Sequence, residues 1–89
     1  RYAASPHTRR LLVEHGGFAY DSDAYNDDRP YWVRVGARAH LVVPYSLVTN
    51  DAKLVGGPLV TGRAFAEFLI DTADELLADG AGPARMMSV

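Results

Sequence analysis

The chain has 89 residues, of which 48% are hydrophobic, with 9 basic and 11 acidic side chains and no cysteine. This length allows a single small folded unit, and the lack of cysteine excludes a disulfide framework and a thiolate metal site. The formal net charge of −2 is spread along the chain, and no apolar run approaches the roughly 18 residues of a membrane helix. We therefore predict no nucleic-acid partner and no membrane partner.

The chain opens with a predicted helix over residues 6–15. Ser5 is an expected N-cap and Pro6 the first helical residue, because proline lacks the N–H group that would have no helical partner there. Two glycines follow His15 and predict a left-handed end to the helix. A brief strand is expected next, at residues 18–20.

An acidic loop and a hairpin are predicted in the middle of the chain. Residues 21–30 hold four Asp and one Asn, side chains that favour turns because they accept hydrogen bonds from nearby backbone N–H groups. The β-rich runs at residues 31–35 and 40–43, joined by residues 36–39, predict an antiparallel hairpin.

The second half begins with a predicted surface connection over residues 45–60, where no periodicity is sustained. Thr61 is expected to cap a helix that continues to Gly80 with an apolar stripe along one face. Residues 85–89 predict the start of a buried strand. The stripe consists of Phe65, Phe68, Leu69, Thr72, Ala73, Leu76 and Leu77.

These elements predict the fold class α/β. Two amphipathic helices and so few strands cannot form a closed layer, so the remaining strands of a barrel or layered sheet are expected outside the 89 residues. We predict one partial domain over residues 1–89, with no separate domains within it.

The acidic loop is the first candidate site. It follows the carboxyl end of a predicted strand, the end at which barrel enzymes hold their functional groups. Crowded carboxylates there suit a cation, a basic partner or the hydroxyl and amide groups of a substrate, but turn formation and capping account for the same residues.

Aromatic side chains surround this loop. Aromatic faces beside carboxylates commonly hold sugars or planar heterocycles, although core packing explains Tyr31 and Trp32 equally well. The aromatic residues concerned are Tyr20, Tyr25, Tyr31, Trp32 and Tyr45.

The histidines offer no metal site. No two of the three histidines have the spacing of a helical zinc motif, so we interpret His7, His15 and His40 as surface or helix-end residues. We predict no metal ligand within this segment.

Four stretches of the sequence resemble one protein family. Residues 21–32 (DSDAYNDDRPYW), 44–51 (PYSLVTND) and 86–89 (MMSV) are similar to the C-terminal part of polysaccharide deacetylases of the NodB-homology type, and most closely to their allantoinase-like branch. Residues 5–12 resemble a helix start of that branch. The resemblance implies the C-terminal segment of a distorted (β/α) barrel with an inserted β-hairpin.

The resemblance also implies an activity. The family hydrolyses non-peptide C–N bonds, in an N-acetyl group on a sugar or in a cyclic amide of the allantoin kind. Its acidic pair, paired histidines and arginine motif are expected upstream of residue 1, and its Leu-His motif after Val89. The segment alone would then be inactive and hold no catalytic residue, and the ligands of any divalent metal such as zinc would lie outside it.

This segment is expected to supply the substrate side of the site, with a small molecule or a sugar as substrate. The substrate-binding candidates are Asp21, Asp23, Tyr25, Asn26, Asp27, Asp28, Tyr31, Trp32, Asn50 and Asp51. The alternative is a non-catalytic binding or accessory domain whose acidic loop binds a cation or a basic partner. A homo-oligomer is possible under both hypotheses, and the cellular location stays open with the cytoplasm favoured.

Overall fold

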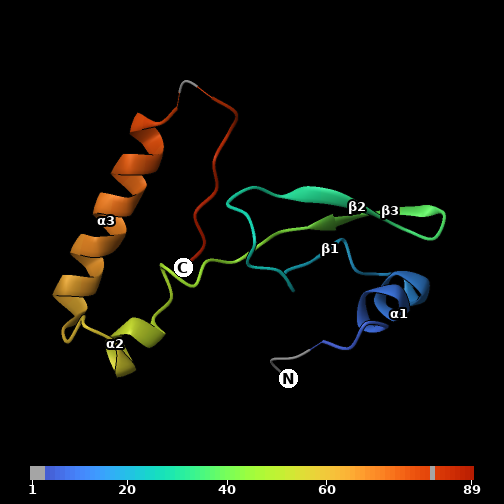
Figure 1. Ribbon diagram of the computed structural model, residues 1–89, viewed down its shortest axis with the longest axis horizontal. Helices are drawn as coiled ribbons and strands as arrows, with labels where there is room; N and C mark the ends of the chain where they lie inside the picture. The colour runs from blue at the N-terminus through green and yellow to red at the C-terminus, as the bar shows by residue number, and fades with distance from the viewer. Residues whose placement is uncertain (1–3, 81) are drawn as a thin grey trace.

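The computed structural model describes residues 4–80 and 82–89, which form a mixed α/β fold. A small sheet lies on one side, the longest helix stands on the other, and the terminal segment, residues 82–89, runs back between them (Figure 1). The elements in chain order are α1 (Thr8–His15), β1 (Tyr20–Asp21), β2 (Tyr31–Val35), β3 (Arg38–Val42), α2 (Ala52–Gly56) and α3 (Gly62–Ala78).

Helix α1 starts later than predicted, at Thr8, with His7 at its N-cap position and no side-chain cap. The predicted cap at Ser5 is wrong because this serine closes a turn before the helix. Its Oγ accepts the N–H of His7 at 3.2 Å, and its carbonyl accepts the N–H of Thr8 at 3.1 Å. The helix ends as predicted at Gly16, whose φ of 75° is left-handed.

The sheet has the order β1-β3-β2, with β1 parallel and β2 antiparallel to the central strand β3. Strand β1 begins two residues later than expected and ends one residue later, so Asp21 belongs to the strand rather than to the loop.

A turn at residues 36–37 joins β2 to β3. Gly36 has a φ of 60° and no other residue of the turn has positive φ, which matches the hairpin turn with glycine in its first central position. The predicted four-residue connection is too long, because Arg38 and Ala39 pair with Val35 and Arg34. The surrounding barrel, and the place of this strand pair within it, stay predictions.

Helix α3 follows the sequence pattern closely. The Oγ1 of Thr61 accepts the N–H of Ala64 at 3.1 Å, which confirms the predicted cap. Within the apolar stripe only Phe65 is buried, and Leu77 is 77% exposed. The short helix α2 interrupts the predicted surface connection, which is therefore wrong over those five residues.

The terminal segment is not the predicted strand, since residues 85–89 have irregular structure. A strand requires a ladder of backbone hydrogen bonds to a neighbouring strand. Here the N–H of Met86 instead bonds to the carbonyl of Asp28 in the acidic loop, at 3.1 Å.

The core is small. Among the described residues, the buried apolar side chains are those of Val13, Val42 and Phe65, with Pro44 also fully buried. The Cα radius of gyration is 15.9 Å, whereas a compact domain of this length would have about 12 Å. The elements therefore form an open assembly. Within residues 4–80 and 82–89, no helix has the length and apolarity required to cross a membrane.

Candidate functional site

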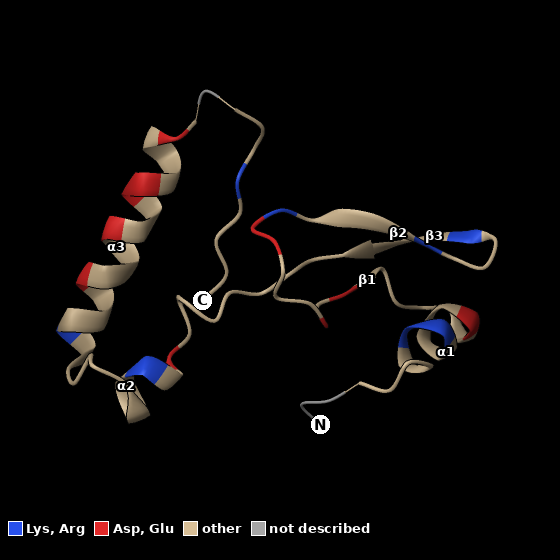
Figure 2. Cartoon of the chain, viewed as in Figure 1, with Lys and Arg blue, Asp and Glu red and all other residues tan. Residues whose placement is uncertain are grey.

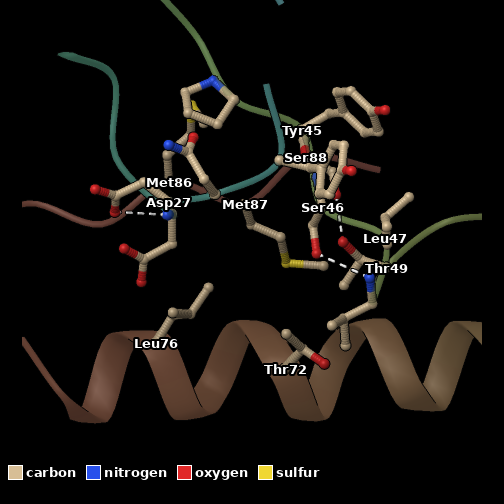
Figure 3. Close-up of a pocket in the computed structure, with 15 residues that line it drawn as sticks. Asp27, Tyr45, Ser46, Leu47, Thr49, Thr72, Leu76, Met86, Met87 and Ser88 are labelled. Atoms are coloured by element: carbon tan, nitrogen blue, oxygen red, sulfur yellow. Dashed lines mark hydrogen bonds between the residues drawn. The ribbon is translucent and has the colours of Figure 1, made fainter. Parts of the chain in front are cut away.

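Three segments that are far apart in the sequence line one cavity of about 360 Å³. They are residues 25–28 of the acidic loop, residues 44–49 before α2 and residues 86–88 of the terminal segment. Figure 3 shows Thr72 and Leu76 of α3 along one side, with the side chain of Met87 extending towards the helix from the opposite side. Three of the four stretches with family resemblance thus contribute to the same cavity, and residues 5–12 do not.

Ser88 joins two walls of this cavity. Its Oγ accepts the N–H of Ser46 at 2.7 Å, and its carbonyl accepts the hydroxyl hydrogen of Thr49, which is only 2% exposed. Ser46 in turn accepts the N–H of Val48 at 3.0 Å through its Oγ. These bonds satisfy polar groups that the contact between the two segments would otherwise bury unpaired.

The acidic loop is attached to the segment that follows β3. The N–H of Val43 donates to the carbonyl of Asp21 at 2.9 Å, and the N–H of Tyr45 donates to the carbonyl of Ala24 at 3.0 Å. The rings of Tyr25 and Tyr45 lie 5.9 Å apart, within the range of favourable aromatic pairs. The loop backbone is therefore ordered next to the cavity.

Acidic positions of the loop lie near basic positions of the backbone in Figure 2. Asp28 contacts Nη1 of Arg85 at 2.8 Å, while Nε of Arg29 lies 3.8 Å from Asp28 and 3.9 Å from Asp27. Partial burial raises the pKa of Asp28, but the Asp27 carboxyl group and the charge of Arg85 outweigh it and lower this pKa. The charged form of Asp28, which accepts hydrogen bonds, is therefore favoured.

Asp21 lies outside the cavity and belongs to a buried polar cluster. Its Oδ2 is 2.8 Å from Nε of Arg9 and 3.0 Å from Nε2 of His40, while its Oδ1 accepts the N–H of Asp23. The hydrogen bond from Arg9 lowers the pKa of Asp21 most, burial opposes it, and Asp23 and His40 lower it further. These contacts join α1 to the start of the acidic loop.

The interpretation of His40 as a surface residue is wrong, since it is only 5% exposed. It lies on the central strand and shares a buried face with Val42, two residues along. This alternation could have been recognised in the sequence. The side chain supplies a partner for Asp21 rather than a metal ligand.

The remaining predicted residues separate into three groups. Tyr25, Asn26, Asp27 and Asp28 line the cavity, and the Tyr31 hydroxyl donates to Oδ1 of Asn26 at 3.0 Å. Asp23 lies outside the lining and Trp32 is 67% exposed, while Asn50 and Asp51 border a different hollow beside α2. The lining residues that the predicted set omitted are Pro44, Tyr45, Ser46, Leu47, Val48, Thr49, Thr72, Leu76, Met86, Met87 and Ser88.

Known proteins resemble the chain in both sequence and fold, although no protein-family model matches it. A putative polysaccharide deacetylase of Schizosaccharomyces pombe is 37% identical over 81 residues, spanning 79% of this chain and 25% of that protein. The crystal structure of Puue allantoinase has a TM-score of 0.83 and 44% identity, over 97% of this chain and 30% of its own. The chain belongs to the polysaccharide deacetylase superfamily.

A second solved structure of the superfamily supports this assignment. A probable polysaccharide deacetylase from Pseudomonas aeruginosa PAO1 has a TM-score of 0.80 and 45% identity, over 96% of this chain and 29% of that one. The nearly equal identities to the two solved structures do not separate the branches of the superfamily. The chain spans about a quarter to a third of the length of these relatives.

The superfamily segment described here does not fit a metal centre by itself. Across residues 4–80 and 82–89, no three His, Asp or Glu side chains come close enough together to hold a metal ion. The carboxylates of Asp21 and Asp28 contact arginines instead. The residues that line the cavity can offer a ligand hydrogen bonds and apolar contacts.

Proposed function

We propose that the full-length protein hydrolyses a non-peptide C–N bond and that this segment forms part of its substrate-binding wall. The observation that carries the proposal is that three of the four family-like stretches, residues 21–32, 44–51 and 86–89, contribute to one cavity. The relatives named as deacetylase and allantoinase support the reaction class. The groups that break the bond, with any divalent metal such as zinc, would lie on other segments.

The cavity has side chains suited to both substrate classes. Cyclic amides and N-acetylated sugars present N–H or O–H donors, which the carboxylates of Asp27 and Asp28 can accept. Met86, Met87 and Tyr25 offer apolar surface for a ring. A volume of about 360 Å³ lies at the lower end of the roughly 300–1,000 Å³ of small-molecule sites, which favours a single ring or one sugar unit.

The alternative function is a binding domain whose acidic loop holds a cation or a basic partner. The contacts of the loop favour this less, because Asp21 and Asp28 each lie 2.8 Å from an arginine of the same chain. A cation would have to displace these guanidinium groups. A substrate donor can instead bond Asp27, whose contact with Nε of Arg29 is longer, at 3.9 Å.

The test uses the purified full-length protein with allantoin and with an N-acetylated oligosaccharide. We expect hydrolysis of one of them, and a KM about tenfold higher in Asp27→Asn, since one charged acceptor is lost. Asp74→Asn, which removes a carboxylate from an exposed position of α3, is the matched control and should leave KM unchanged. Failure to hydrolyse either compound, with Asp27-dependent binding of Ca²⁺ or of a basic peptide, would establish the alternative.

A further inference from the structure

Arg85 stands outside the cavity lining but contacts two of the elements that form it. Its Nη1 donates to Oδ2 of Asp28 in the acidic loop at 2.8 Å, and its Nη2 donates to Oδ2 of Asp79 at 3.0 Å. Asp79 is the C-cap residue of α3. One guanidinium group thus connects the terminal segment, the loop and the end of the helix.

The next residue strengthens the same contact. The N–H of Met86 donates to the carbonyl of Asp28 at 3.1 Å, so adjacent residues hold Asp28 by its side chain and by its backbone. Met86 and Asp28 both line the cavity, whereas Arg85 does not. A shift of the Arg85 side chain would therefore change the distance between two cavity walls.

Exposure indicates what kind of effect to expect. The side chains of Arg85, Asp28 and Asp79 are 29%, 42% and 63% exposed, and ion pairs with such exposure contribute little to global stability. The Arg85 guanidinium is planar, and its two terminal nitrogens bond two different carboxylates at once. This geometry fixes the orientation of Asp28 relative to Asp79. The effect should appear in the local geometry of the loop.

We propose that Arg85 is a positioning residue that holds the acidic loop against the terminal segment and α3, and thereby sets the affinity of the cavity for substrate. Its effect on substrate rests on the proposed function, while its effect on the loop can be measured separately. Lysine can replace one of the two contacts but not both, since its ammonium group lacks the fork. Arg85→Lys should therefore give an intermediate phenotype.

The first measurement is amide hydrogen exchange in the full-length protein, for residues 24–30 and 84–89. We expect about tenfold faster exchange in Arg85→Ala, because local opening of the loop becomes easier, and a smaller increase in Arg85→Lys. Arg10→Ala removes an exposed arginine whose Nε lies 3.7 Å from Glu14, and should leave these segments unchanged. Unchanged exchange in Arg85→Ala would overturn the proposal whether or not the protein is active.

The second measurement is kinetic and uses the substrate that the wild-type protein hydrolyses. We expect KM to rise about fivefold in Arg85→Ala with kcat nearly constant, since the residue acts on binding geometry. The double variant Arg85→Ala/Asp28→Asn should be no worse than the poorer single variant, because both changes remove one interaction. A loss of kcat at constant KM, or fully additive effects, would contradict the positioning role. Inactivity of the wild type on both compounds would refute the proposed function, and the exchange result would still decide whether Arg85 positions the loop.

Discussion

The two halves of the chain are held together in different ways. The N-terminal half, α1 with the three-stranded sheet, has a ladder of backbone hydrogen bonds and a buried cluster in which Arg9, Asp21 and His40 satisfy one another. The C-terminal half has a long helix with Phe65 as its single buried residue, and contacts the acidic loop through the Arg85–Asp28 ion pair and the Met86 N–H. The first half is stabilised by hydrogen bonds among its own elements, whereas the position of the second half depends on its contacts with other segments.

The candidate site lies where these two halves meet. Its loop wall is hydrogen-bonded to the segment after β3, and its opposite side is α3, which has Phe65 as its single buried residue and stands apart from the sheet in Figure 1. Flexibility of the second half would therefore change the shape of the cavity without disturbing the sheet. The following predictions test this difference between the halves.

The largest effect is expected when the 89 residues are studied alone. With Val13, Val42 and Phe65 as the buried apolar side chains among the described residues, too little apolar surface is removed from water to offset the loss of chain entropy. We expect no cooperative thermal transition by calorimetry, and association through the exposed apolar surfaces. A sharp two-state transition of a monomer would show that the second half, like the first, folds stably without contacts to further segments.

The polar cluster of the first half should show the next largest effect. Replacing Arg9 by alanine in the full-length protein leaves the largely buried Asp21 carboxylate without its strongest partner. We expect a loss of about 2–3 kcal/mol in unfolding free energy, after allowing for the partial exposure of Arg9. Chemical denaturation measures this loss, with Arg10→Ala as the control one residue away. Equal stability of both variants would mean that the cluster does not hold the first half together.

The sequence predicts the elements whose conformation is determined by neighbouring residues, and not those determined by contacts with distant segments. The Thr61 cap and the left-handed Gly16 are encoded within a few residues of the helix end that they define, and both were predictable. The irregular structure of residues 85–89 depends on the loop carbonyl that takes up the Met86 N–H. That partner lies far away in the sequence, and no local pattern contains it.

The candidate site divides in the same way. Asn26, Asp27 and Asp28 were recognisable from their turn-forming and hydrogen-bonding side chains, and Tyr25 from its aromatic ring beside them. Ser46, Thr49 and Ser88 were not, because an isolated serine or threonine carries no signal until its partner is known. The burial of His40 is encoded locally, by its alternation with Val42 along one strand, whereas the spacing of the three histidines carries no information about burial.

A smaller effect is expected at the start of α3. Thr61→Ala leaves the N–H of Ala64 without its acceptor, and loss of such a cap costs about 1 kcal/mol. Because α3 borders the cavity, KM should rise together with the loss of stability, which urea denaturation and substrate kinetics can measure. Thr61→Ser keeps the acceptor oxygen and should restore both. If KM stays constant while stability falls, the start of α3 does not influence the cavity.

The smallest effect concerns the pH dependence of the first half. The pKa of Asp21 lies below its ordinary value of 3.8, chiefly because Arg9 donates to its carboxylate. A carboxyl group with a depressed pKa in the folded state stabilises that state above its ordinary pKa, and the contribution is lost as the pH falls through the folded-state value. The Tm difference between wild type and Asp21→Asn should therefore be constant from about pH 7 to pH 5 and decrease towards about pH 3. Asp74→Asn, at an exposed position of α3, should show no such decrease. A Tm difference that is independent of pH would mean that the charge on Asp21 does not stabilise the cluster, and that hydrogen-bond geometry alone, which asparagine partly preserves, holds α1 against the sheet.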